Sequence, residues 1–223
     1  MITKSAILPA AGSATRMRGL PKFMLPCSQD YETLLERHIN YLLPLVDTIW
    51  IPTRPEYAHL IVRLGFGSKI IVHALETETM SETVIKVANV AKADRFILCM
   101  PDTYFHGELP YDKLSSSLSN VDLSIFEIRD DQKGKLGQIL LDDNGMVIDA
   151  MDKKLDCDYK YAWGALSFTD EFVKLLDEKE PHVGYAIPRA IKTLDISGSI
   201  IDSEYFDCGT PKEYLRMLKT VWD

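Results

Sequence analysis

Short apolar runs alternate with amphipathic stretches through the first half of the chain. Four runs have the length of buried strands: residues 5–9, 47–51, 69–73 and 95–100. Three stretches repeat their apolar positions at helical spacing: residues 33–43, 53–64 and 81–91, with Thr53 expected to cap the second. Strand–helix–strand repetition predicts a parallel sheet with helices on both faces and right-handed crossovers.

The second half of the chain has a mixed pattern. Extended segments are expected at residues 121–129, 138–141, 146–150, 161–168, 197–201 and 204–207. Asn144-Gly145 predicts a hairpin turn between the second and third of them. Helices are expected at residues 170–178, after Thr169, at 183–194, and from Pro211 to Trp222.

The fold class that follows is α/β. The sequence contains no internal repeat, low-complexity tract or linker, so we expect one domain over residues 1–223, with three α/β/α layers around a mixed, mostly parallel sheet.

Composition narrows the class of protein. The 223 residues are 46% hydrophobic and 26% charged, which excludes a disordered chain. The net charge of −8 argues against a broad basic face, and so against a nucleic acid partner. No stretch has the length and apolarity of a signal peptide core or a membrane span, so we expect a cytoplasmic protein with no membrane partner.

The four cysteines are far apart in sequence. Cys27, Cys99, Cys157 and Cys208 form no CxxC pair, so a zinc knuckle or a dithiol redox motif is not indicated. Two disulfides are one alternative, and in a chain of this kind we favour buried free thiols.

The first candidate for chemistry is the segment that follows the first strand. Pro9 and the small residues Ala10-Ala11-Gly12-Ser13 would let backbone N–H groups approach phosphate oxygens, and the cations Arg16 and Lys22 follow. The segment contains neither a GxxxxGK[ST] nor a GxGxxG motif. A flexible loop with two solvated cations is the alternative interpretation.

Two aspartates end predicted strands. Asp102 follows the strand at 95–100, at the sheet edge where α/β folds bind ligands, and Asp207 ends the strand at 204–207. Together the two carboxylates would suit Mg²⁺. Taken singly, Asp102 could form a turn and Asp207 could cap the last helix.

Several of these motifs resemble one family. Ala10-Ala11-Gly12, Thr15-Arg16-Met17, Pro21-Lys22 and Leu25-Pro26 resemble the N-terminal signature of the sugar-phosphate nucleotidyltransferases of the NDP-sugar pyrophosphorylase type. Further similarities follow in the family's order at Asp102, at residues 147–153, at residues 163–168 and at Asp207 with Gly209-Thr210-Pro211. The resemblance extends over nearly the whole chain and implies a GT-A-like fold.

The resemblance implies an enzyme of nucleotide-sugar biosynthesis. It would join an NTP (UTP, dTTP or CTP) to a sugar 1-phosphate with Mg²⁺ as cofactor and release pyrophosphate, acting as a monomer or homo-oligomer. Residues 1–105 would bind the nucleotide and residues 106–223 the sugar phosphate. The implied roles are catalytic for Arg16 and Lys22, nucleotide-binding for Pro9, Ala10, Ala11, Gly12, Ser13, Glu76 and Ser81, sugar-phosphate-binding for Gly137, Asp152, Lys153 and Gly164, and metal-binding for Asp102 and Asp207.

Some positions depart from the family pattern. Ser81-Glu82 stands where Gly-Thr often opens a helix, and Lys154 stands where Pro is usual. Glu76 lies near the place where relatives often present a Gln to a pyrimidine. An ionised carboxylate only accepts hydrogen bonds, which suits the amino group of cytosine and points to CTP.

Other classes remain as alternatives. A cytidylyltransferase acting on a non-sugar phosphate such as phosphocholine would use the same residues. A catalytically inactive binding or regulatory homologue would keep the fold, although the joint presence of Arg16, Lys22, Asp102 and Asp207 argues against it. A metal-dependent glycosyltransferase would need a DxD motif, and Thr103-Tyr104 follows Asp102.

Overall fold

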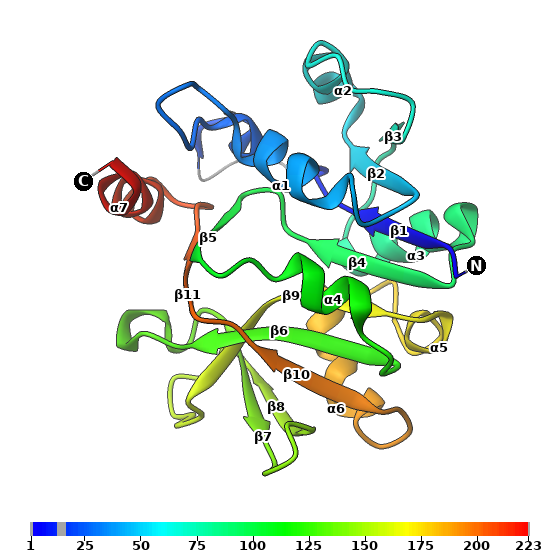
Figure 1. Cartoon of the computed structure of the whole chain (residues 1–223), viewed down its shortest axis with the longest axis vertical. Coiled ribbons are helices and arrows are strands. Elements are labelled where there is room, and N and C mark those ends of the chain that lie inside the picture. Colours follow the sequence, from blue (N-terminus) through cyan, green and yellow to red (C-terminus); the bar gives the residue numbers. More distant parts are fainter. Residues whose placement is uncertain (1, 13–16, 223) are drawn as a thin grey trace.

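A nine-stranded, mostly parallel sheet forms the centre of the molecule (Figure 1). The computed structural model describes residues 2–12 and 17–222. The main path of the sheet runs β3 (Ile70–Ala74), β2 (Thr48–Thr53), β1 (Lys4–Ile7), β4 (Arg95–Cys99), β9 (Tyr161–Phe168), β6 (Val121–Glu127) and β10 (Ile196–Ile200). β9 is antiparallel to both of its neighbours, β4 and β6. The predicted mixed, mostly parallel sheet is therefore confirmed.

Four further strands extend this framework. The hairpin of β7 (Gly137–Leu141) and β8 (Val147–Asp152) branches from β9, with Gly145 at a φ of 79° in its turn as the Asn-Gly pair predicts. β5 (Thr103–Gly107) and β11 (Ser203–Asp207) form a separate antiparallel ribbon. The sequence pattern did not reveal β5, because its pairing partner lies almost at the other end of the chain.

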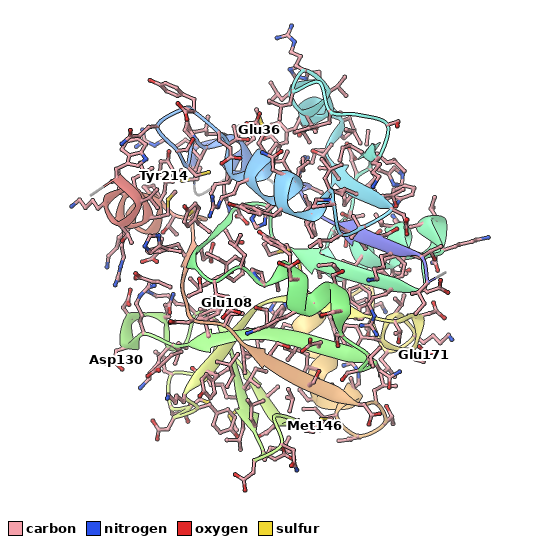
Figure 2. All side chains as sticks on the ribbon, viewed as in Figure 1. Glu36, Glu108, Asp130, Met146, Glu171 and Tyr214 are labelled. Atoms are coloured by element: carbon pink, nitrogen blue, oxygen red, sulfur yellow. The ribbon has the colours of Figure 1, made fainter. Side chains whose placement is uncertain are left out.

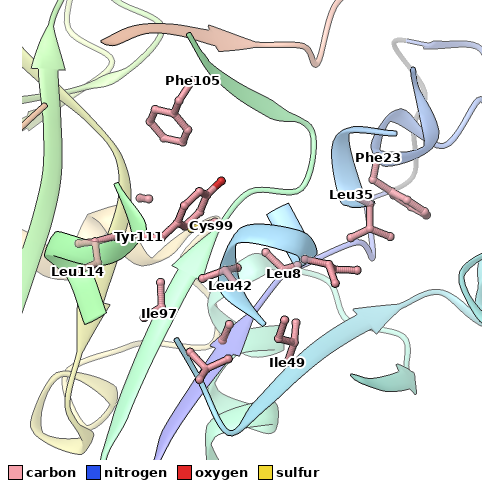
Figure 3. Packing of buried hydrophobic residues seen from close by; sticks show 14 of the residues in the cluster. Leu8, Phe23, Leu35, Leu42, Ile49, Ile97, Cys99, Phe105, Tyr111 and Leu114 are labelled. Carbon is pink, nitrogen blue, oxygen red and sulfur yellow. The ribbon is translucent and has the colours of Figure 1, made fainter. Parts of the chain in front are cut away.

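Helices cover both faces of the sheet. α1 (Leu34–Leu42), α2 (Pro55–Val62) and α4 (Tyr111–Ser116) pack on one face, and α3 (Met80–Ala91), α5 (Asp170–Val173) and α6 (Ile187–Ala190) pack on the other. Alternate residues of β4 separate accordingly, with Ile97 and Cys99 in the first core and Phe96 and Leu98 in the second. Figure 3 shows the first core, in which α1 and α4 lie over the sheet.

The last helix, α7 (Pro211–Trp222), begins and ends as predicted and packs beside the sheet. Its buried Met217 contacts a third cluster that contains Leu25 and Phe206. Tyr214, labelled in Figure 2, donates its hydroxyl to the Pro26 carbonyl at 2.8 Å. The strand that ends at Asp207 is thereby held against the segment that carries Lys22.

Two predicted helix starts are wrong. Thr53 is the last residue of β2 and donates to the Ala10 carbonyl, so it does not cap α2, which has Arg54 at its N-cap and Pro55 at its first position. The helix expected from residue 81 begins at Met80, and Thr79 caps it with a side chain that accepts from the Glu82 N–H.

The two late helices are shorter than predicted. α5 ends at Val173, and the Asp177 side chain then accepts from the Lys179 N–H in a turn that competes with a longer helix. The stretch expected at 183–194 divides into a 3₁₀ segment, Val183–Ala186, and the four residues of α6. Pro188 stands in the first turn of α6, where its missing N–H costs no helical hydrogen bond. Two other 3₁₀ segments are Lys22–Met24 and Asp130–Gln132.

The buried His38 of α1 forms hydrogen bonds to β5 and α4. Its Nε2–H donates to the Thr103 carbonyl at 3.0 Å, and its Nδ1 accepts from the Tyr111 hydroxyl at 2.8 Å. Burial is the main reason that the pKa of His38 falls to about 4, and the nearby Arg37 cation lowers it further. The ring is therefore neutral in the folded protein near neutral pH.

We predict an acid-sensitive contribution of His38 to stability. The unfolded chain binds a proton at this ring below about pH 6.5, whereas the folded chain does so only near pH 4, so stability falls as the pH falls between these values, by about 3 kcal/mol. Urea unfolding at pH 7 and pH 4.5 measures this loss. His38→Gln should be less stable at pH 7 and should lose less on acidification, and equal losses in the two proteins would contradict the assignment.

Candidate active site

The β5–β11 ribbon places two carboxylates next to each other. Asp207 is paired with Thr103 in the strand register, and the Cys208 N–H donates to the Asp102 carbonyl at 3.0 Å. Asp102 and Asp207 therefore come from adjacent positions of the ribbon, although they are far apart in sequence. The convergence expected from their places at strand ends is observed.

Lys22 lies beside these carboxylates. Its Nζ is 3.3 Å from Asp102 Oδ2, and both side chains are less than a fifth exposed. The Gly209 N–H donates to Asp207 Oδ1 at 3.0 Å. A Cβ at Gly209 would lie 2.7 Å from that oxygen and 3.3 Å from Lys22 Nζ. A residue without a side chain is thus required where the cation and the second carboxylate approach each other.

These groups line a cleft of about 240 Å³, which we call the central cleft. Pro9, Ala10 and Gly12 form part of its wall, and Lys22, Asp102 and Asp207 supply its charges. The cleft is at the carboxyl ends of β1 and β4, where α/β sheets bind ligands.

Hydrogen bonds to β2 hold the loop after β1. The Ala10 N–H donates to the Pro52 carbonyl at 2.8 Å, and the Ala10 carbonyl accepts from the Thr53 hydroxyl at 3.3 Å. Ala11 and Gly12 follow, and both line hollows that adjoin the central cleft. Ser13 and Arg16 lie outside the described residues.

Two groups close to the carboxylates are poor nucleophiles: Tyr205, which lines the cleft, and Cys208, which follows Asp207 in the chain. Burial raises the pKa of Tyr205 well above its usual range, and the negative charges of Asp207 and Asp102 raise it further. The same causes, again with burial first, raise the pKa of Cys208. Both groups stay protonated near neutral pH, so neither provides an anion for covalent catalysis.

The N-terminus of α3 borders a second region. Thr77, Thr79, Met80 and Thr83 line a hollow of about 150 Å³ that shares Gly12 with the central cleft. Ser81 is completely buried, so the structure does not bring this predicted nucleotide-binding residue to the surface of the hollow.

Glu76 lines a wider, open region of about 540 Å³, the glutamate hollow, which continues from the loop at Ala11. Glu78, Glu82 and Glu178 also line it, together with the cations Arg54 and Lys179. Glu82 is not a free ligand, because it accepts from the Glu78 N–H and pairs with Lys86 at 2.6 Å. The Glu82 departure from the family pattern is therefore explained as stabilisation of the start of α3.

The end of β8 carries the predicted acidic–lysine pair. Asp152 Oδ2 lies 3.2 Å from His182 Nε2, and Lys153 Nζ lies 3.3 Å from the same nitrogen. The Gly184 N–H donates to His182 Nδ1, so Nε2 carries the proton and donates to Asp152. His182, which belongs to none of the sequence motifs, therefore holds the carboxylate of the pair.

Gly137 and Gly164, both predicted to bind the sugar phosphate, lie in close contact with aromatic rings. A Cβ at Gly137 would lie 2.3 Å from Trp163 Nε1, and Gly137 and Asp152 line a hollow of about 390 Å³ with Trp163 and Tyr185. Gly164 is buried beneath the rings of Tyr205 and Phe105, so it supports the wall of the central cleft from behind.

Lys153, which follows β8, lines a different hollow from Asp152. With Lys135 and Lys212 it lines a hollow of about 370 Å³, the lysine hollow, which reaches Asp207. Lys135 and Lys212 were not predicted, because each is an isolated cation in a polar stretch and only the fold brings them to Lys153.

The cysteines are in the state expected from the sequence. Cys27, Cys99, Cys157 and Cys208 are buried free thiols, as predicted. Figure 2 labels the exposed charged residues Asp130 and Glu171 at opposite edges of the view. No helix among the described residues has the length and apolarity needed to span a membrane. Within residues 2–12 and 17–222, no three His, Cys, Asp or Glu side chains gather as a metal centre would require.

Comparison with known proteins gives a consistent result. The family model of the MobA-like NTP transferase domain matches residues 6–139. No curated protein sequence matches the chain.

Among solved structures, a UDP-glucose pyrophosphorylase in complex with UDP-glucose has a TM-score of 0.83 at 17% identity, covering 100% of this chain and 99% of the other. The inositol-1-phosphate CTP transferase from T. maritima has a TM-score of 0.79 at 16% identity, covering 100% and 98%. HddC from Yersinia pseudotuberculosis has a TM-score of 0.71 at 21% identity, covering 99% of each chain. At these identities the similarity establishes the fold.

We predict that the cleft wall tolerates no side chain at Gly164. In Gly164→Ala the Cβ would meet a ring carbon of Tyr205 at 2.7 Å, so the ring must move, at a cost of about 1–3 kcal/mol in the free energy of unfolding. Gly67→Ala is the matched control, because its Cβ would contact nothing within 4 Å. Urea unfolding of the two variants checks this, and equal stabilities would contradict the packing role.

Proposed function

The chain belongs to the family of MobA-like NTP transferase domains and is a nucleotidyltransferase, and we propose that it transfers a nucleotidyl group from an NTP to a sugar 1-phosphate. The observation that carries this proposal is the convergence of Lys22, Asp102 and Asp207 in one cleft beside the loop at residues 9–12. Under it, residues 1–105 bind the nucleotide and residues 106–223 the acceptor, within a single domain.

The physical difficulty of this reaction is charge. A triphosphate and a phosphate monoester are both anions, and each like-charged pair at about 4 Å costs roughly 1 kcal/mol in water and about 4 kcal/mol at an effective dielectric constant of 20. Cations must therefore be in place before the two substrates meet.

The chain offers such cations on both sides of the carboxylates. Lys22 and Arg16 would bind the triphosphate and then the leaving pyrophosphate, and Lys153 would bind the acceptor phosphate. An oxygen of the acceptor phosphate attacks the α-phosphorus, and the bond from that phosphorus to the β-phosphate oxygen breaks to release pyrophosphate. The attacking phosphate needs no general base, because its second pKa is about 6. Neither Tyr205, which lines the cleft, nor Cys208 is therefore needed as a base.

Asp102 and Asp207 fit a magnesium ion. Mg²⁺ is commonly held by one or two carboxylates together with substrate phosphates and water, so two adjacent aspartates suffice without a larger protein cage. Bound there, the ion would withdraw charge from the phosphates. In its absence the Lys22 ammonium offsets the charge of Asp102.

CTP is the nucleotide that Glu76 favours. Its exposed carboxylate lies in the glutamate hollow beyond the loop at Ala11, and it accepts but does not donate hydrogen bonds. The amino group of cytosine satisfies such an acceptor, whereas the carbonyl of uracil at that position does not. Pyrophosphate release measured with each NTP against glucose 1-phosphate and phosphocholine separates the sugar acceptor from a non-sugar acceptor.

We predict that either metal-binding carboxylate is essential for turnover. Asp102→Asn and Asp207→Asn remove the charge and keep the shape, so each should reduce pyrophosphate release at saturating NTP by about 10²-fold or more, with an unchanged circular dichroism spectrum. Asp112→Asn, on the exposed surface of α4, is the control and should retain full activity. Wild-type rates in both active-site variants would refute the metal assignment.

Substitution of Lys22 and of Lys153 should change different kinetic constants. Lys22→Ala should lower kcat by about 10²-fold, because it removes a group that stabilises the leaving pyrophosphate. Lys153→Ala should raise the KM of the sugar phosphate more than that of the NTP. Steady-state kinetics with each substrate varied in turn would show this, and the reverse KM pattern for Lys153→Ala would mean that the acceptor site is misplaced.

A further inference from the structure

The lysine hollow gathers three cations from three separate elements. Lys135 comes from the loop after the 3₁₀ segment Asp130–Gln132, Lys153 from the end of β8, and Lys212 from the first turn of α7. The backbone fixes two of these positions, because the Lys135 N–H donates to Gln132 and the Lys153 N–H donates to Leu136. The hollow is thus a feature of the fold and not a chance meeting of flexible chains.

The charges around the hollow are not balanced. Glu213, in its wall, pairs at 2.9 Å with Arg129, which also pairs with Asp131 and Glu204. Asp207, the other carboxylate of the wall, belongs to the proposed metal pair. Among the described residues, neither Lys135 nor Lys212 forms an ion pair, although the Lys135 charge contributes to lowering the pKa of Asp131. The hollow therefore holds three lysines against two carboxylates, in a chain whose net charge is −8.

Two of the three lysines stand where protein stability disfavours them. Lys153 has a φ of 52°, in the left-handed region that glycine occupies at lower cost. Lys212 is the second residue of α7, where the positive end of the helix dipole repels a cation and favours an anion. Side chains that oppose folding are explained if they bind something, and lysines bind anions.

One acceptor phosphate does not account for all three cations. The proposed function, on which this inference rests, requires Lys153 for the phosphate that attacks the NTP. Lys135 and Lys212 lie in the same hollow and have no role in that step. We propose that the natural acceptor carries a second anionic group, and that Lys135 and Lys212 bind it while Lys153 binds the reacting phosphate.

A matched pair of sugar phosphates tests this proposal. Isothermal titration calorimetry with Mg²⁺ and without NTP would compare glucose 1-phosphate with glucose 1,6-bisphosphate, which differ only in the second phosphate. We expect the bisphosphate to bind at least about tenfold more tightly at low salt, since exposed charges are strongly screened at high salt. Raising the salt concentration should reduce this advantage.

Variants assign the advantage to particular residues. The double substitution Lys135→Ala and Lys212→Ala should abolish the preference for the bisphosphate and leave glucose 1-phosphate binding within about twofold. Its melting temperature should equal or exceed that of the wild type, because Lys212 opposes the helix dipole. Lys133→Ala is the control from the same loop, since Lys133 pairs with Asp130 at 3.2 Å and does not line the hollow.

The possible results distinguish the second anionic group from the proposed nucleotidyl transfer to a sugar 1-phosphate. Equal affinities of the wild type for the two compounds, or a preference that persists in the double variant, would refute the second anion and leave the nucleotidyl transfer to a sugar phosphate intact. Binding of neither compound by a protein that still binds CTP would refute the proposed acceptor site itself.

Discussion

The hydrogen bond between the Cys208 N–H and the Asp102 carbonyl sets the geometry on which the site depends. Through it the β5–β11 ribbon holds Asp102 and Asp207 side by side in a partly buried cleft, where two carboxylates repel each other. Such a pair persists only with a cation near by, and Lys22 supplies one. Under the proposed function, the same repulsion favours a divalent ion between the carboxylates, and that ion would in turn attract the phosphates.

Several residues around this cleft occupy positions that lower the stability of the fold. Lys153 has a left-handed backbone conformation, and Lys212 places a positive charge at the positive, N-terminal end of α7. The buried Ser81 hydroxyl has no hydrogen-bond partner among the described residues. The two apolar cores on either side of the sheet offset such costs. The contrast is instructive, because Glu82 and His182, which resemble ligands, are engaged in holding α3 and Asp152.

The sequence predicted what local chemistry determines. The Asn144-Gly145 turn, the start of α7 at Pro211 and the strands of the parallel sheet follow from turn preferences, proline geometry and apolar runs. Strand ends also predicted that Asp102 and Asp207 meet. No local pattern predicts the pairing of β5 with β11, because the two strands are far apart in the sequence. The same is true of the hollow lined by Lys135, Lys153 and Lys212. Pro188 and the Asp177 turn were visible in the sequence, but their effect on helix length depended on the competing packing of that region.

The most direct test of this account is a crystal structure with Mg²⁺ and a non-hydrolysable CTP analogue. We predict that Asp102 and Asp207 both bind the same ion and that Lys22 leaves Asp102 to contact the phosphates. An ion bound elsewhere, with the contact between Lys22 and Asp102 intact and the phosphates outside the central cleft, would contradict the account.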